Sequence, residues 1–214
     1  MKIEAFLFDL DGTLVNSIPL YRHAYLQTLR AFGLALTQQD FEKIYRENRK
    51  LTNVLARFGL SHRDAEIREY RNELYTRALS AQVTWFEDAK SFADSFDDPA
   101  PCAIVTGSWR SYVDAIEKRV DLSLLSSMVI TADEYMPDGK PHPRSLLLAA
   151  ERLDVAPERC IYVGDQDFDI HAARAAGMTD ILIRREHTPP QACESASHII
   201  QSLEELPALL AQMR

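Results

Sequence analysis

Short apolar runs recur along the chain, and each has the length of a β-strand. The first run, residues 3–8, is apolar and aromatic-rich and leads directly into acidic residues and a glycine. Similar runs, most of them ending at a polar or glycine-containing turn, occupy residues 102–105, 128–130, 160–163 and 181–183. Short apolar runs bounded by turns are typical of strands that are buried on both faces. The pattern therefore predicts a buried sheet.

Between the later runs the apolar residues follow a helical period. The corresponding helices are predicted at about residues 110–120, 143–153 and 169–176. A capping-box pattern from Ser202 to Glu205 predicts one more helix near the end of the chain. Alternating strands and helices are the signature of a parallel sheet with helices on both faces. The predicted fold class is therefore α/β.

The interval from residue 16 to residue 83 contains no convincing strand pattern. Gly33 and Gly59 are predicted to end helices there, and Thr37 and Ser61 to begin them as N-caps. Several amphipathic helices in succession would form an all-helical insert after the first strand. We therefore expect a catalytic core made of residues 1–15 and 84–214 and a helical domain made of residues 16–83. The Pro-containing, polar stretch at residues 186–197 is expected to be irregular.

Composition and charge narrow the possible functions. The chain of 214 residues is 46% hydrophobic and 26% charged, as in ordinary globular proteins, and its formal net charge is −8. This acidic balance argues against binding nucleic acid, whose phosphates need a positive surface. Without a membrane-length apolar stretch or a signal-peptide pattern, the protein is expected to be cytoplasmic and to have no membrane partner. Three widely spaced cysteines suggest neither disulfides nor a zinc site.

Polar residues follow several of the predicted strands, where ligands bind in open parallel sheets. Crowded carboxylates repel one another unless a cation neutralises them, and an all-oxygen ligand set favours Mg²⁺. Thr106 and the backbone amides of Gly107 and Ser108 would suit a phosphate group, and Lys140 adds a compact positive charge. The residues expected to converge are Asp9, Asp11, Gly12, Thr13, Thr106, Gly107, Ser108, Lys140, Gly164, Asp165, Asp167 and Asp169.

These residues form four ordered motifs, at residues 9–15, 106–108, 140–141 and 164–169. In sequence and order they resemble the motifs of the haloacid-dehalogenase-like superfamily, particularly its phosphoglycolate phosphatase and β-phosphoglucomutase-like members. The resemblance spans most of the chain. It implies a Rossmann-like core, and it makes the helical insert similar to the C1 cap of those proteins.

The resemblance also implies a role for each motif. Asp9 would be the nucleophile that becomes phosphorylated, and Asp11 the acid/base that serves the leaving oxygen and then water. The Mg²⁺ ligands would be Asp9, the backbone carbonyl of Asp11, Asp165 and Asp169, the last directly or through water. The transferred phosphoryl group would be bound by Thr106, Gly107, Ser108 and Lys140. The implied function is Mg²⁺-dependent hydrolysis of a small phosphorylated metabolite through an aspartyl phosphate.

Three other functions fit the sequence less well. Halogen displacement is disfavoured because family members that perform it lack an acid at the position of Asp11. A β-phosphoglucomutase-like mutase would need a histidine in the first cap helix, where this chain has Tyr21, with His23 nearby but displaced. A non-catalytic binding module controlled by phosphorylation would need neither Asp11 nor a cap. The phosphatase is therefore the leading hypothesis.

The identity of the substrate is left open by the sequence. Arg46, Arg49 and Lys50 lie in the helical insert and would contact an anionic substrate tail, or else form a solvated helix face. Residues 86–88 depart from the Pro-Gly that relatives commonly carry there, so no closer subfamily is assigned. The oligomeric state is likewise not predicted.

Overall fold

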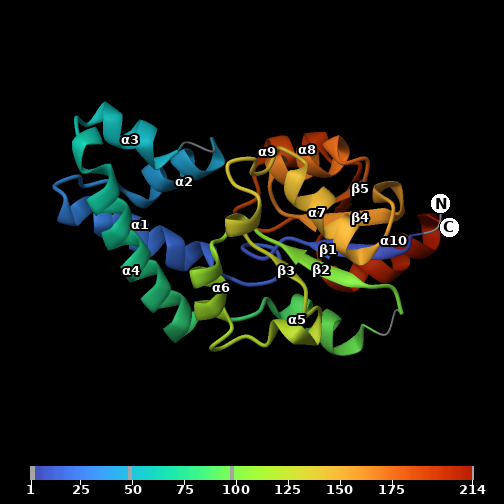
Figure 1. Cartoon of the computed structure of the whole chain (residues 1–214). Coiled ribbons are helices and arrows are strands. Elements are labelled where there is room, and N and C mark those ends of the chain that lie inside the picture. The colour runs from blue at the N-terminus through green and yellow to red at the C-terminus, as the bar shows by residue number, and fades with distance from the viewer. Residues whose placement is uncertain (1–2, 48–49, 97–98, 214) are drawn as a thin grey trace.

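The computed structural model describes residues 3–47, 50–96 and 99–213. Within them a parallel sheet of six strands has the order β3-β2-β1-β4-β5-β6 (Figure 1). The strands are Ala5–Phe8 (β1), Cys102–Val105 (β2), Val129–Ile130 (β3), Cys160–Gly164 (β4), Thr179–Ile183 (β5) and His198–Ile200 (β6). The predicted α/β class with a Rossmann-like parallel sheet is confirmed.

The α-helices are α1 (Ile18–Ala31), α2 (Gln38–Arg46), α3 (Leu51–Arg57), α4 (Asp64–Gln82), α5 (Glu87–Ser95), α6 (Arg110–Ile116), α7 (Arg144–Leu153), α8 (Asp167–Ala175), α9 (Pro190–Ser195) and α10 (Leu206–Met213). Short 3-10 turns are η1 (Ser61–Arg63), η2 (Leu122–Leu124), η3 (Ala132–Glu134), η4 (Pro157–Arg159) and η5 (Leu203–Glu205). None of the helices in the described ranges is long and apolar enough to cross a membrane.

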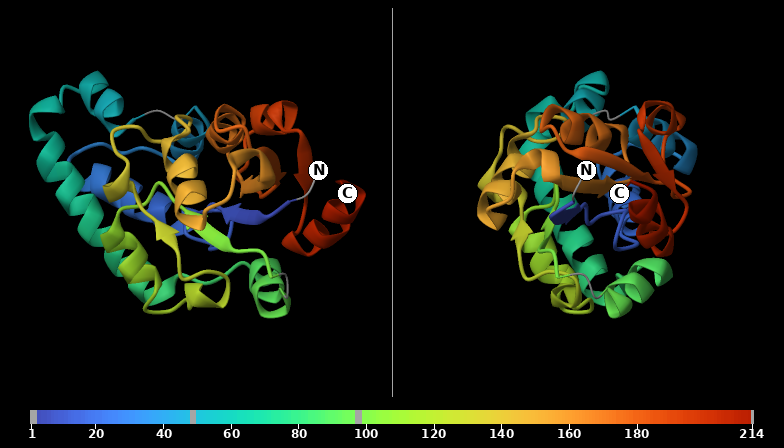
Figure 2. Two further views of the ribbon diagram at one scale, coloured as in Figure 1. Left: turned by 45° about the vertical axis from the view of Figure 1, so that its right-hand side comes forward. Right: turned by 90° about the vertical axis from the view of Figure 1, so that its right-hand side faces the viewer.

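The alternating side chains of the sheet build a core layer on each face. On β1, Ala5 and Leu7 pack with residues of α7 and α8, whereas Phe6 and Phe8 pack with residues of α5 and α6. This alternation follows from the two-residue period of a strand, whose successive side chains point to opposite faces. The two views of Figure 2 show helices on both sides of the sheet. The centre of the sheet is thus formed by a fully buried strand.

Within residues 18–47 and 50–82, the regular elements of this helical segment are α1 to α4 and the turn η1, and no strand forms there. A separate apolar cluster lies inside this segment, built around Tyr25, Leu29, Phe41, Leu55 and Ile67. Thr37 caps α2 as predicted, accepting a hydrogen bond from the amide of Asp40, whereas Ser61 begins a 3-10 turn and does not cap a helix.

The two chain segments that connect these helices to the sheet lie side by side. The amide of Asn16 donates to the carbonyl of Thr84 at 2.9 Å, and the amide of Phe86 donates to the carbonyl of Leu14 at 3.0 Å. Val15 and Trp85 form an isolated antiparallel bridge between these two bonds. The helical segment therefore leaves and rejoins the sheet at a single place.

Some elements differ from the sequence prediction. Strand β6 was not predicted, and α9 lies in the stretch expected to be irregular. Helix α6 ends at Ile116, short of the predicted residue 120. At the end of the chain Ser202 accepts from the amide of Glu204 and starts η5, so α10 begins only at Leu206. The difference arises because Ser202 caps a tighter turn, and the helix follows it.

Candidate active site

The site forms where β1 and β4 end next to each other. Phe8 pairs with Val163 in the sheet, and the amide of Asp9 donates to the carbonyl of Val163 at 2.8 Å. Asp165 follows directly after β4, so the two carboxylates leave neighbouring strands at the same edge. β2 flanks β1 on the other side and ends just before Thr106. The parallel topology thus converts distant positions in the sequence into one site.

Three buried carboxylates meet at this edge. Oxygen atoms of Asp9, Asp165 and Asp169 all lie within 4.8 Å of one another. Burial raises the pKa of Asp9 well above its usual value, and the charges of Asp169, Asp165 and Asp11 raise it further, although Lys140 opposes them. Three carboxylates are thus crowded together in a place that water does not reach.

Lys140 is the cation that bridges this cluster. Its Nζ lies 2.6 Å from Asp9 Oδ1, 2.6 Å from Asp169 Oδ1 and 2.7 Å from the hydroxyl of Tyr162. Burial would lower the pKa of Lys140, but Asp169 and Asp9 outweigh it and raise that pKa well above its usual value. The amine is therefore protonated and anchored in the site, beside the proposed nucleophile.

Asp165 is held by three side chains. Thr13 Oγ1 donates to its Oδ1 at 2.9 Å, and the side-chain amide of Gln166 donates to its Oδ2. His187 Nε2 lies 2.9 Å from the same Oδ2. Burial would raise the pKa of Asp165, but the hydrogen bonds and the nearby His187 outweigh it and lower that pKa. Asp165 is thus kept ionised without access to water.

Asp11 faces a different set of partners. Ser17 Oγ donates to Asp11 Oδ1 at 2.7 Å and Ser108 Oγ donates to Asp11 Oδ2 at 2.7 Å. Thr106 Oγ1 donates to the same Oδ2 at 3.1 Å, and the Tyr75 hydroxyl lies 3.4 Å from Oδ1. The acid/base candidate is therefore fixed between the end of β2 and the helical segment.

The structure brings most of the predicted residues together, but not all of them. Gly107 lies exposed between Thr106 and Ser108, just before α6. Asp167 points away from the cluster, accepting from Ser195 Oγ at 3.0 Å. Arg49 lies outside the described residues, and Lys50 is exposed at the start of α3.

Several contacts to the site were not anticipated. Ser17 and Tyr75 come from the helical segment, Tyr162 from within β4, and His187 from the loop after β5. His187 could have been found from the sequence, because it follows a strand just as the other site residues do. Ser17 and Tyr75 carry no such signal, since their approach to Asp11 depends on how the helices pack.

A cavity of about 450 Å³ opens between the helical segment and the sheet edge. Its lining includes Arg22 from α1, Tyr45 and Arg46 from α2, and Arg185 and His187 from the loop after β5. Because His187 also contacts Asp165, this cavity adjoins the carboxylate cluster. Arg185 is already engaged, since its guanidinium pairs with Asp88 at 2.9 Å and donates to the carbonyl of Thr13 at 2.9 Å. Arg22 and Arg46 are therefore the better candidates for meeting a ligand there.

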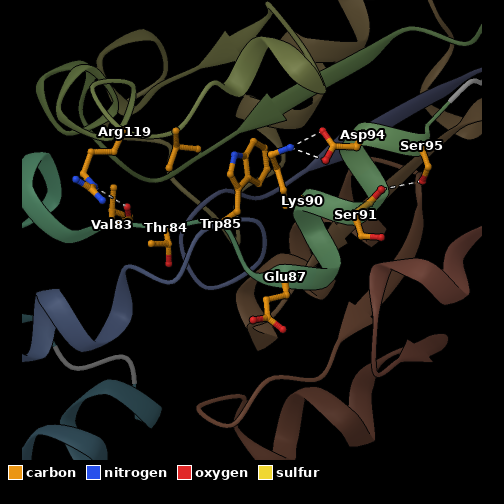
Figure 3. Close-up of a pocket in the computed structure, with 10 residues that line it drawn as sticks. Val83, Thr84, Trp85, Glu87, Lys90, Ser91, Asp94, Ser95 and Arg119 are labelled. Carbon is orange, nitrogen blue, oxygen red and sulfur yellow. Dashed lines mark hydrogen bonds and ion pairs between the residues drawn. The ribbon is translucent and has the colours of Figure 1, made fainter.

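A second hollow lies away from the carboxylates. It is an open groove of about 790 Å³ beside the chain segment that returns to the sheet, lined by Thr84, Trp85, Lys90 and Arg119 among others (Figure 3). Lys90 pairs with Asp94 on the same helix, and Arg119 Nε donates to the carbonyl of Val83 at 3.3 Å (Figure 3). Lys90, Asp94 and Arg119, three of the charged residues that line this groove, are thus engaged in contacts within a helix or with the backbone.

The carboxylate cluster fits a hard divalent cation. Its donors are all oxygen atoms and they are buried, and after burial itself the neighbouring carboxylates Asp169 and Asp165 add to the raised pKa of Asp9. Such a donor set suits Mg²⁺, which takes carboxylate oxygens and keeps several waters. Asp9 and Asp165 would be direct ligands, and Asp169, which accepts from Lys140, Tyr162 and the backbone amide of Gln166, would bind directly or through a water.

Comparison with known proteins finds relatives that are enzymes. Residues 6–183 match the model of a family described as haloacid dehalogenase-like hydrolase. A fructose-1-phosphate phosphatase of Escherichia coli, YqaB, is 30% identical over 188 residues, which cover 86% of this chain and 97% of that protein. A phosphoglycolate phosphatase of Xanthomonas campestris is 31% identical over 183 residues, covering 83% and 81%. The crystal structure of a haloacid dehalogenase-like protein from Agrobacterium tumefaciens superposes with a TM-score of 0.80 at 26% identity, over 99% of each chain.

Proposed function

Because the chain belongs to the haloacid dehalogenase-like hydrolase family, we propose that it is a Mg²⁺-dependent phosphatase acting on a small phosphomonoester. The proposal rests on one observation: two carboxylates near the end of β1 have different hydrogen-bonding partners. Asp9 lies among carboxylates and Lys140, whereas Asp11 is held by the hydroxyls of Ser17, Thr106 and Ser108. Separate environments for neighbouring acids allow separate chemical roles.

Asp9 is assigned the role of nucleophile. One of its oxygens attacks phosphorus, the bond from phosphorus to the leaving oxygen breaks, and an acyl phosphate forms on Asp9. Lys140 stays within 2.6 Å of the attacking carboxylate and balances the charge of the transferred group. Bound Mg²⁺ would neutralise the crowded carboxylates and polarise the phosphoryl oxygens.

Asp11 is assigned the proton transfers. As the acid it gives a proton to the leaving oxygen, and as the base it then takes one from the water that hydrolyses the Asp9 phosphate. Thr106 and Ser108, which contact Asp11 in this structure, would turn their hydroxyls towards the phosphoryl group when substrate binds. Phosphate release returns Asp9 to its starting state.

The named relatives support a small substrate. They include phosphatases of fructose 1-phosphate, phosphoglycolate and glyceraldehyde 3-phosphate. A mutase receives no support from the residues that would distinguish it. Tyr21 packs against Tyr25, Phe41 and Tyr75 in an aromatic cluster, and His23 is exposed on α1.

Metal dependence tests the proposal directly. Turnover of an aryl phosphate by the purified protein is expected to fall to background in EDTA and to return when excess Mg²⁺ is added. Beryllium fluoride with Mg²⁺ is expected to inhibit, because it forms an adduct on Asp9 that mimics the aspartyl phosphate. Full turnover in chelator, or a beryllium adduct on another residue, would contradict the assignment.

We further propose that residues 16–83 act as a cap that closes over the site. The neighbouring connections at Asn16 and Thr84 could serve as a joint hinge, and α1 and α2 already form one wall of the cavity beside the carboxylates. Closure would exclude bulk water during transfer of the phosphoryl group. The leaving group would then face the cap side chains, which would set specificity.

Arg46 offers a test of this cap. If Arg46 contacts the substrate tail, Arg46→Ala is expected to lower kcat/KM for the physiological substrate about tenfold. This is the usual contribution of one hydrogen bond to a charged group. Turnover of a small aryl phosphate, which has no such tail, should stay nearly unchanged. Lys43→Ala, on the same helix but exposed and outside the cavity lining, is the matched control. A metabolite-phosphate panel would supply the substrate, and equal losses on both substrates would return Arg46 to a structural role.

A further inference from the structure

We infer that His187 joins two parts of the enzyme, positioning the carboxylate of Asp165 for the metal and forming the core side of a contact with Tyr45 that holds α2 over the site. The inference rests on the proposed function in one respect only, that Asp165 binds the cation. His187 is a positioning residue in this scheme, because it acts through Asp165 and does not touch the reacting atoms.

The contact with Asp165 is built into the fold. Asp165 is completely buried, so His187 Nε2 at 2.9 Å must carry the hydrogen and donate it to the ionised carboxylate. With Thr13 and Gln166 also donating, this bond helps to fix the carboxylate's orientation. Hydrogen bonds to metal-binding carboxylates orient them, and losing such a partner commonly weakens metal affinity about 10- to 100-fold.

Gly12 leaves the space that His187 occupies. A methyl group placed on Gly12 would lie 2.6 Å from His187 Nε2 and 2.9 Å from Asp165 Oδ2, too close for any side chain. Gly12 also has a φ of 88°, which favours glycine. The glycine of the first motif therefore has a particular use in this chain, since it admits an imidazole against the metal-binding carboxylate.

Tyr45, on α2, contacts the same imidazole. The two ring centroids are 6.3 Å apart with the planes at 74°, an edge-to-face arrangement. Tyr45 in turn stacks on Phe41, with centroids 5.6 Å apart and planes at 21°, which ties the contact to the apolar cluster of the helical segment. Burial and the charges of Asp165, Asp11 and Asp9 raise the pKa of Tyr45 well above its usual value. The phenol is therefore neutral and lies close to the carboxylates.

The hydrogen-bond donor of His187 and its aromatic ring can be tested separately by substitution. His187→Ala removes both, His187→Gln keeps a hydrogen-bond donor without the aromatic ring, and Tyr45→Ala removes only the cap side. Magnesium binding to the metal-free protein can be measured by titration calorimetry, independently of activity. Closure of α2 can be followed by hydrogen exchange of the amides of residues 38–46.

We expect His187→Ala to raise the Kd for Mg²⁺ about tenfold or more and His187→Gln to recover most of that loss. Tyr45→Ala should leave the Kd within about twofold. Both His187 variants and Tyr45→Ala should speed exchange in α2. The double variant His187→Ala with Tyr45→Ala should exchange little faster than Tyr45→Ala alone, because Tyr45→Ala already removes the contact with His187 together with the stacking on Phe41. His23→Ala, an exposed histidine on α1, should change neither quantity.

The outcomes distinguish this inference from the function on which it rests. Unchanged Mg²⁺ binding in a folded His187→Ala protein would overturn the positioning role, and unchanged exchange in α2 would overturn the contact with the cap. If His187→Ala does not fold, the Gln variant still tests the ring and Tyr45→Ala still tests the cap. A wild-type protein that binds no Mg²⁺ would overturn the proposed metal site as well.

Discussion

Replacing Asp9 with Asn is expected to lower phosphatase turnover by more than about 10³-fold, because an amide oxygen is too poor a nucleophile to attack phosphorus. Loss of the nucleophile in a hydrolase that uses covalent catalysis costs up to about 10⁶-fold. The change should not unfold the protein. Asn is nearly the same size, and Lys140 keeps Asp169 and Tyr162 as partners. Removing the charge also removes the cost of burying it and the repulsion by neighbouring carboxylates, the two effects that raise the pKa of Asp9.

Steady-state hydrolysis of an aryl phosphate with Mg²⁺ is the measurement, and thermal unfolding checks the fold. Asp167→Asn is the matched control, since it makes the same chemical change in the same region of the sheet edge. Asp167 bonds to Ser195 and His171 and makes no contact with the carboxylate cluster. A folded Asp9→Asn protein that keeps a tenth or more of wild-type turnover would remove Asp9 from the role of nucleophile.

Replacing Asp11 with Asn is expected to slow the reaction by about 10²–10⁴-fold, the usual contribution of a positioned acid/base. The two chemical steps should respond differently to the leaving group. A good leaving group such as an aryl oxide needs little help from an acid, so phosphorylation of Asp9 should proceed. Hydrolysis of the aspartyl phosphate still needs a base, so the phosphorylated protein should accumulate.

Intact-protein mass spectrometry after rapid quenching would detect this covalent adduct, and single-turnover kinetics would separate the two steps. For an alkyl phosphate, whose leaving group is poor, both steps should be slow and no adduct should build up. Equal rates for wild-type and Asp11→Asn protein with an alkyl phosphate would exclude Asp11 as the acid. Ser17, Thr106 and Ser108 can all hydrogen-bond to an amide, so the variant should keep the local geometry.

The parts of the fold that were predictable are those in which local pattern and burial agree. β1 and β4 are short apolar runs buried along their whole length, so their composition alone identifies them. β6 has only three residues, begins with His198 and has Ile199 exposed, so its membership of the sheet depends on pairing with β5. Short edge strands of this kind show only a weak hydrophobic pattern in the sequence.

The same distinction applies to the residues of the candidate site, some of which follow from local sequence pattern while others do not. Asp9, Thr106 and Asp165 follow strands, and a parallel sheet brings such residues together whatever their separation in sequence. Ser17 and Tyr75 reach Asp11 from α1's start and from the middle of α4. Their positions depend on how helices pack over the sheet, which is decided by many small contacts and by no local motif.

The helical segment leaves and rejoins the sheet at neighbouring positions, and this arrangement affects how the inserted helices can change during evolution. The backbones at Asn16 and Thr84 meet within hydrogen-bonding distance, and β1 and β2 remain adjacent whatever lies between them. An insertion whose ends meet can lengthen, shorten or be exchanged at little cost to the rest of the domain. Substrate preference can therefore evolve in the inserted helices while Asp9, Lys140 and Asp165 keep their places on the sheet.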